Sequence, residues 1–198
     1  ADVGYKGNQT IMNQAGNNHG CIECINGQWY IFYQRHTHGT SYSRQACAEK
    51  IDILSDGSIP MVEMTSCGLN NGALMGSGTY EAAYCCNISN RKMKYVMNGK
   101  ASANSSCISS DGKMRFITNI SNNTLIGYKC FRFNGVSQVG IKYRGVAKGN
   151  IFIYTEQKGK EVGKIPIDEN RDWITTVTTC NIPNGIKDLF FVYKGKGK

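Results

Sequence analysis

The feature that most restricts the fold is a series of short runs of β-branched and aromatic residues, with turn residues between them about every ten residues. The turn signals are clearest at Asn26-Gly27, Asn134-Gly135 and Asn184-Gly185, and an Asn-Gly pair is a strong hairpin signal. No segment repeats its apolar residues with the period of an amphipathic helix. The 198 residues are therefore predicted to form an all-β protein.

The first part of the chain, residues 20–64, is predicted to form one four-stranded, antiparallel sheet. Four such strands in about 45 residues have the size of one blade of a β-propeller. A single blade buries its faces only against neighbouring blades, so this segment is expected to be part of a larger object. The expected strands are Gly20–Ile25, Gln28–Gln34, Ser43–Leu54 and Ser58–Met64.

The second part of the chain, residues 81–198, contains seven more short runs of this kind. Many short strands with regular turn signals are typical of a β-sandwich or jelly roll. The expected strands are Met114–Ile120, Leu125–Phe133, Val136–Arg144, Asn150–Thr155, Glu161–Ile167, Trp173–Cys180 and Asp188–Tyr193.

The two parts differ in charge. Residues 1–80 hold four basic and six acidic residues, whereas residues 81–198 hold nineteen basic and eight acidic residues. The change places a boundary near Gly76–Tyr80. A basic domain attracts polyanions such as nucleic acid or an acidic polysaccharide, but no arginine-rich helix or zinc-finger spacing favours nucleic acid. A solvated basic surface without a specific partner is the alternative.

The nine cysteines do not indicate a disulfide framework. Cys21 and Cys24 form a C-x-x-C motif, but no second pair follows at the spacing of a zinc site. Cys85 and Cys86 are adjacent and cannot easily pair with each other. We therefore expect mostly reduced, buried thiols. No apolar run approaches the roughly 18 residues of a transmembrane helix, so no membrane partner is expected.

Several motifs in the first part are familiar. The motifs G-N-N-H-G-C-I-E-C-I-N-G-Q-W-Y-I-F-Y (16–33), S-R-Q-A-C-A-E (43–49) and V-E-M-T-S-C-G-L-N (62–70) resemble the last propeller blade of glycoside hydrolase family 43. The motif G-T-Y-E-A-A-Y (78–84) resembles the linker that leaves that propeller. The resemblance implies that residues 1–77 are a remnant of the last blade of a five-bladed propeller.

Motifs in the second part are similar to the family 6 carbohydrate-binding modules that follow such enzymes. They are V-G-I-K-Y-R-G (139–145), V-G-K-I-P-I (162–167), R-D-W-I-T-T (171–176) and L-F-F-V-Y-K-G-K-G (189–197). The resemblance implies that residues 78–198 form a carbohydrate-binding module with a jelly-roll sandwich. The module is expected to be truncated, because the family has an asparagine and an aspartate beyond the position of Lys198.

The resemblance implies carbohydrate binding by the C-terminal region of a secreted, hemicellulose-degrading enzyme. The expected partner is a plant cell-wall polysaccharide such as xylan or arabinoxylan, and neither nucleic acid nor a membrane is expected. In the family an inverting mechanism uses three carboxylates from earlier blades, so the catalytic residues are expected outside this chain. The alternative is a complete β-xylosidase or α-L-arabinofuranosidase whose other blades come from other chains. Exposed blade edges also predict docking on the sandwich, self-association or fraying.

The resemblance assigns the sugar contacts of the module. Trp173 matches the tryptophan that flanks the family 6 cleft, and we expect it in a polar loop beside Asp172, with a core position as the alternative. Tyr128 is a candidate for the second aromatic contact, although strand alternation would place it inside. Arg44 matches an arginine that reaches the hydrolase substrate pocket, and without the pocket carboxylates it is expected to be an exposed charge.

The resemblance also implies calcium. His19 matches a histidine that lies near the propeller cation and acts through ordered water, since calcium prefers oxygen ligands; a hydrogen-bonded histidine at a strand end is the alternative. Glu81 is the only candidate for an acidic calcium ligand near the start of the module. The other carboxylates of the first part match no catalytic motif and are expected to be solvated. They are Glu49, Asp52, Asp56 and Glu63.

Overall fold

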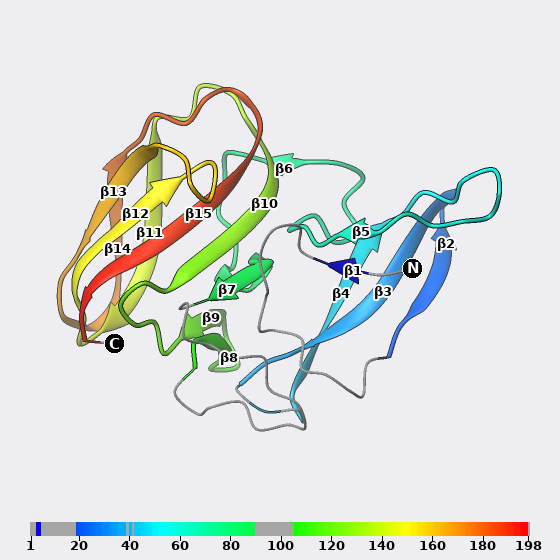
Figure 1. Cartoon of the computed structure of the whole chain (residues 1–198). Helices are drawn as coiled ribbons and strands as arrows, with labels where there is room; N and C mark the ends of the chain where they lie inside the picture. The colour runs from blue at the N-terminus through cyan, green and yellow to red at the C-terminus, as the bar shows by residue number, and fades with distance from the viewer. Residues whose placement is uncertain (1–2, 5–18, 39, 41, 90–104, 198) are drawn as a thin grey trace.

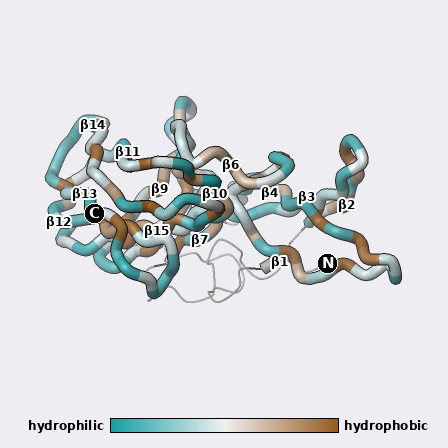
Figure 2. Tube along the Cα trace, turned by 90° about the horizontal axis from the view of Figure 1, so that it is seen from above, coloured by the Kyte–Doolittle hydropathy of each residue, from teal (hydrophilic) through white to brown (hydrophobic). Residues whose placement is uncertain are grey.

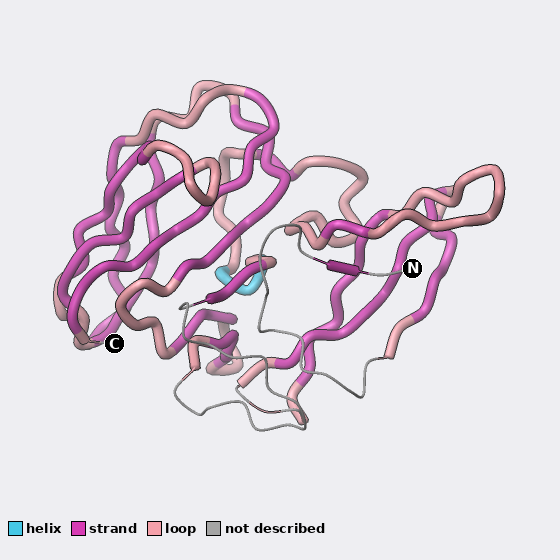
Figure 3. The backbone as a smooth tube through the Cα atoms, viewed as in Figure 1, coloured by secondary structure: helices cyan, strands magenta, loops and turns pink. Residues whose placement is uncertain are grey.

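The protein is described by a computed structural model that covers residues 3–4, 19–38, 40, 42–89 and 105–197 (Figure 1). The all-β prediction is confirmed. In the described residues the one helical element is a single 3-10 turn, η1 (Ala82–Tyr84), which lies between a layered β-sandwich and a smaller sheet (Figure 3). None of the described helical residues forms a segment that is long and apolar enough to cross a membrane.

The smaller sheet, which we call the blade sheet, consists of three antiparallel strands. These are β2 (Cys21–Ile25), β3 (Gln28–His36) and β4 (Arg44–Lys50), in the order β2-β3-β4. The predicted hairpin turn is confirmed, because Asn26 and Gly27 both have positive φ angles of 52° and 79°. A two-residue turn of this kind needs positive φ at both positions, which asparagine and glycine tolerate best.

The fourth predicted strand, Ser58–Met64, does not join the blade sheet. Its only strand residues are β5 (Val62–Glu63), which pairs in parallel with β1 (Val3–Gly4). Two physical reasons explain the difference. Pro60 has no N–H to donate to a ladder, and the residues that follow it bond to the sandwich instead, where the Ser66 amide donates to the Lys129 carbonyl at 3.2 Å.

The sandwich has one large sheet, in the order β13-β12-β15-β10. The free edge of β10 is covered by two short strands, β6 in parallel and β7 in antiparallel orientation. β6 precedes the predicted boundary at residue 77, so the first part of the chain already contributes to this sheet. The bounds are β6 (Leu74–Met75), β7 (Asn87–Ser89), β10 (Leu125–Phe133), β12 (Lys148–Tyr154), β13 (Glu161–Ile167) and β15 (Gly185–Lys196).

A second layer lies against this sheet. It contains the pair β11 (Gln138–Gly145) and β14 (Asn170–Thr179), and a hairpin of β8 (Cys107–Ser110) and β9 (Arg115–Thr118) lies beside η1. The core between the layers is a cluster of buried side chains from β12, β13 and β15, against which alternate residues of β11 pack. Its buried members are Ile153, Ile165, Ile167 and Tyr193, and the β11 members are Val139, Ile141 and Tyr143.

All seven strands predicted for the second part are present, and β10 and β13 have the predicted limits. One limit is wrong in a way that matters for function. β14 begins at Asn170 rather than Trp173, because Asn170 pairs with Gly145 across a register shift. The polar residues before Trp173 suggested a loop, but polar side chains are also tolerated on the outer face of a sandwich.

The nine cysteines are all free thiols. Cys85 and Cys86 are buried, as expected, and burial raises the pKa of the Cys85 thiol to about 11. Cys21 and Cys24 are exposed on β2, and the other five cysteines are only partly buried, so the expectation of mostly buried thiols is wrong.

The blade sheet packs on the face of the large sheet that points away from the second layer. Two views show the sandwich strands at one end of the molecule and β2–β4 at the other (Figures 1 and 2). An apolar cluster fills the junction between them, with Met64, Cys86 and Phe190 buried and Tyr33, Leu125 and Tyr154 packed around them. Of the outcomes expected for an uncovered blade, the structure has docking on the sandwich.

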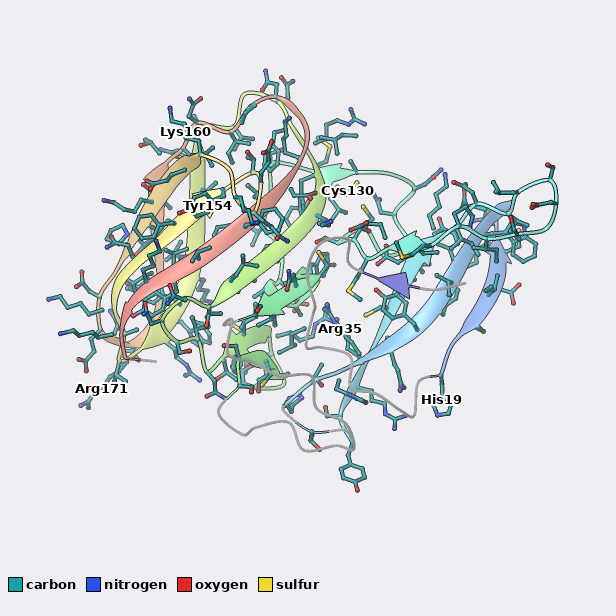
Figure 4. All side chains as sticks on the ribbon, viewed as in Figure 1. His19, Arg35, Cys130, Tyr154, Lys160 and Arg171 are labelled. Carbon is teal, nitrogen blue, oxygen red and sulfur yellow. The ribbon has the colours of Figure 1, made fainter. Side chains whose placement is uncertain are left out.

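A buried arginine connects the two parts. Arg35 of β3 is only 5% exposed, and Figure 4 shows it between the blade sheet and the sandwich. Its guanidinium donates to the carbonyls of Ala83 and Cys85, next to η1, and to the Gln45 side chain at 3.0 and 3.1 Å. Every one of these bonds is to a neutral acceptor, so the charge is held by carbonyl dipoles.

Replacing Arg35 with methionine should loosen the blade sheet. The change leaves two buried carbonyls without a donor, which costs roughly 1–3 kcal/mol each. In hydrogen exchange, amides of β2–β4 should exchange faster in the variant, whereas amides of β10 and β15 should keep their protection. Arg44→Met, at an exposed position of the same sheet, is the matched control and should change neither set. Unchanged protection of β2–β4 in Arg35→Met would show that the arginine does not hold the junction.

Candidate functional site

Trp173 lies on the outer face of the sandwich. Tyr143 of β11 pairs with Ile174 of β14, and Tyr143 packs against the buried core. Because successive side chains of a strand point to opposite faces, the neighbours Arg144 and Trp173 point outward. The side chain of Trp173 is half-buried. The expected loop position is therefore wrong, but the position on the surface rather than in the core is right.

Three side chains surround the indole ring of Trp173. The ring of Phe116 in β9 meets it at an interplanar angle of 61°, with 5.5 Å between centroids. The guanidinium carbon of Arg144 lies 4.8 Å from the indole centroid, and Nζ of Lys142 lies 6.0 Å from it. Cations at these distances are attracted by the negative face of the ring. We call this group of four residues the outer-face cluster.

The sequence did not point to the two cationic residues of the outer-face cluster as site residues. Lys142 and Arg144 are exposed and lie two apart on β11, so they share one face. Only the register of β11 against β14 places them beside Trp173. The K-Y-R alternation in the sequence was the available signal, but it does not say which strand lies alongside.

Asp172 adjoins the outer-face cluster without forming an ion pair among the described residues. Its side chain is exposed, and its backbone amide donates to Oδ1 of Asn170 at 3.0 Å. This local bond accompanies the register shift of the strand pair. Trp173 and Asp172 are thus consecutive residues of β14, and their side chains point in different directions.

Tyr128 is part of the interior. Its hydroxyl donates to the Ala82 carbonyl at 3.0 Å, and its ring meets Phe191 edge to face, with 5.7 Å between centroids. Burial raises the pKa of Tyr128 well above its usual value. The ring packs against two core clusters and offers no stacking face beside Trp173. The inward alternative is the one that the structure shows.

Arg44 and His19 belong to the other end of the molecule. Figure 4 shows His19 beyond the blade sheet and Arg171, two residues before Trp173, at the opposite side. Arg44 is the first residue of β4, is exposed, and donates to Oε1 of Gln34 at 3.1 Å. It also lies opposite His36, whose pKa is lowered by burial and by the Arg44 charge. The structure does not bring Arg44 to the outer-face cluster.

The residues suggested for calcium do not fit a cation site together. The Glu81 carboxylate forms an ion pair with Arg115, and its Oε2 accepts from Nε of Arg115 at 2.6 Å. A guanidinium in that place competes with a metal ion for the carboxylate. The described part of the chain has no group of three or more His, Cys, Asp or Glu side chains arranged around a common point.

Glu49 is the carboxylate that the sequence placed wrongly. It was expected to be solvated, but it is 3% exposed at the junction of the blade sheet and the sandwich. It accepts hydrogen bonds from the Thr65 amide and hydroxyl at 2.9 and 2.7 Å and from the Tyr33 hydroxyl at 3.1 Å. Burial raises its pKa to about 7, although these hydrogen bonds and the charge of Arg35 oppose the shift.

The junction also contains a cavity of about 320 Å³. Glu49 and Glu63 both line it, but Glu63 forms an ion pair with Lys129, whose Nζ also lies 3.9 Å from Asp188. Glu49 and Glu63 are thus occupied by partners within the protein, whereas Asp52, which also lines the cavity, is exposed as expected. Asp56 is likewise exposed and caps its own turn by accepting from the Ser58 amide at 2.9 Å.

Comparison with known proteins gives one close sequence relative. A curated xylosidase/arabinosidase from Thermoclostridium stercorarium is 43% identical over 209 residues, which cover 98% of this chain and 42% of the relative. The chain thus spans less than half the length of the relative that it matches. No family model matches the chain.

Two solved structures share the fold. A glycoside hydrolase family 43 arabinoxylan arabinofuranohydrolase from Bacillus subtilis, in complex with cellotetraose, covers 100% of this chain and 41% of its own, with a TM-score of 0.56 and 19% identity. A family 6 carbohydrate-binding module from Clostridium stercorarium, in complex with cellobiose, covers 63% of this chain and 90% of its own, with a TM-score of 0.52 and 17% identity. These comparisons confirm the resemblance indicated by the sequence motifs.

The buried carboxyl group of Glu49 predicts a pH-dependent stability. Its pKa is about 7 in the folded protein and 4.5 without the protein around it, so the folded state opposes ionisation. The free energy of unfolding should therefore fall as the pH rises from about 4.5 to about 7, by an amount on the order of a few kcal/mol. Glu49→Gln should remove this slope and stabilise the protein at pH 8, as measured by urea unfolding.

Glu23→Gln is the matched control, because Glu23 lies exposed on the same sheet. It should leave the pH dependence unchanged. A full slope that persists in Glu49→Gln would show that another group controls it.

Proposed function

We propose that this chain, which is homologous to part of a xylosidase/arabinosidase, binds plant cell-wall polysaccharide of the xylan or arabinoxylan type through the outer-face cluster. The observation that carries the proposal is the position of Trp173, which is half-buried on the outer face of the sandwich and packs against Phe116. The sequence relative supports the class of ligand, since it is named a xylosidase/arabinosidase.

The chemistry of sugar recognition fits this cluster. Axial C–H groups of a pyranose pack against an aromatic surface, while nearby polar groups donate to its hydroxyls. The exposed part of the Trp173 indole and the guanidinium stacked on it form one continuous surface. Thr175, which faces outward opposite Lys142, adds a hydroxyl on the same face. Asp172, which directly precedes Trp173 in the chain, is an exposed acceptor beside this surface.

The remaining candidate residues have other roles in this proposal. Tyr128 supports the interior beneath the site, and Arg44 belongs to the blade sheet. Sugar affinity at a single aromatic site is weak, but attachment to a longer enzyme raises the local concentration of substrate, so weak affinity is sufficient. The proposed role is therefore to hold the polysaccharide near a catalytic domain.

Removal of the indole should weaken binding strongly. Trp173→Ala should lower the affinity for xylan, measured by affinity gel electrophoresis, by roughly ten- to a hundredfold, because loss of an aromatic stacking platform costs about 1–3 kcal/mol. The thermal midpoint should fall only slightly, since the side chain is half-buried.

Trp29→Ala provides the control. Trp29 is 41% exposed on the blade sheet, away from the outer-face cluster, and its removal should leave retardation unchanged. Equal binding by Trp173→Ala and the wild type would refute the assignment of the site, and loss of binding in Trp29→Ala alone would place the sugar on the blade sheet.

A further inference from the structure

Arg144 is held in a fixed position by the aromatic residues beneath it. Phe116 packs its ring against Trp173, and the Trp173 indole in turn carries the Arg144 guanidinium at 4.8 Å. A planar guanidinium on an aromatic face loses little further freedom when it binds a ligand. The three side chains come from β9, β14 and β11, so the arrangement is a product of the tertiary fold.

The hydrogen-bonding capacity of this guanidinium is not used within the described protein. The ion pairs of the described residues involve Arg115 and Lys129, and neither Arg144 nor Lys142 has a carboxylate within 4.0 Å. No hydrogen bond from either side chain to another described residue occurs. The guanidinium carbon lies over the indole ring, and the five N–H groups of an arginine radiate in the guanidinium plane. The donors therefore remain available to a ligand.

Two acidic residues lie near Arg144 and Lys142, but neither forms an ion pair with them. Asp111, in the turn between β8 and β9, uses Oδ1 to accept from the amides of Lys113 and Met114, both at 3.0 Å. These bonds lower the pKa of Asp111, and the Arg144 charge adds to the effect. Asp172 is exposed and forms no ion pair with either cation. The outer-face cluster itself carries two positive charges, on Lys142 and Arg144, in the part of the chain that has the basic excess.

We propose that Arg144 and Lys142 form a subsite for a carboxylate, so that the preferred ligand is a polysaccharide that carries uronic acid groups. This inference rests on the proposed function and specifies its ligand. The planar fork of arginine matches a carboxylate with two parallel hydrogen bonds. Lys142, on the same face of β11 and with Nζ 6.0 Å from the indole centroid, adds a second positive charge. The sugar ring of the uronate or its neighbour then packs on the exposed indole.

The test compares acidic and neutral forms of one polymer. Binding of the full chain to glucuronoxylan, to the same xylan after chemical reduction of its carboxyl groups, and to arabinoxylan is measured by isothermal titration calorimetry. The wild type should bind glucuronoxylan about tenfold or more tightly than the reduced polymer, because a hydrogen bond to a charged group is equivalent to at least about a tenfold change in affinity.

Variants test whether the Arg144 guanidinium causes the tighter binding to the acidic polymer. Arg144→Gln should bind the acidic and the reduced polymers with equal affinity. Arg144→Lys should recover only part of the preference, since a lysine cannot form the paired hydrogen bonds. Arg132→Gln is the matched control, because Arg132 is an exposed arginine of β10 in the other layer. It should keep the full preference.

The outcomes separate this inference from the proposed function. Equal binding of both polymers by the wild type, abolished by Trp173→Ala, would overturn the uronate subsite and leave the proposed function intact. Absence of binding to any xylan would overturn both. Equal losses in Arg132→Gln and Arg144→Gln, or equally tight binding to duplex DNA, would overturn the subsite in favour of attraction by overall charge.

Discussion

The buried guanidinium of Arg35 is the interaction on which the arrangement of the two parts depends. A charge in a protein interior is tolerated only when its hydrogen-bonding groups are satisfied, and the acceptors here come from both sides of the junction. Gln45 lies on the blade sheet, whereas the carbonyls of Ala83 and Cys85 lie next to η1. Separation of the two parts would break bonds on one side, so the blade sheet and the segment that enters the sandwich hold each other in place.

The second constraint is the free edge of β10. An uncovered edge strand presents unpaired backbone groups and invites association with other chains. Here β6 and β7, which flank η1 in the sequence, pair with opposite ends of β10. Gly127 permits the close approach, because a Cβ atom there would lie 3.2 Å from Cβ of Asn87. The connecting segment is thereby built into the sandwich sheet rather than acting as a free linker.

The proposed binding site lies away from this junction. The blade sheet packs on the outer face of the large sheet, while the outer-face cluster lies on β9, β11 and β14 of the other layer. The site is consequently not covered by the docked blade sheet. Its cations and its aromatic rings share one surface, which combines the packing of a sugar ring with attraction for a negative charge. The same fold therefore holds the two parts together on one side and presents a binding surface on the other.

The sequence by itself determined most of the longer strands and their turns, because these depend on local patterns. The limits of β10 and the positive φ angles of Asn26 and Gly27 follow from alternation and from turn chemistry. Tertiary structure alone decided the burial of Glu49 and the neighbours of Trp173. Each depends on which distant segment lies alongside, since Thr65 satisfies Glu49 and Arg144 covers the indole. Such pairings leave no periodic trace in the sequence, because each partner contributes a single side chain from a separate segment of the chain.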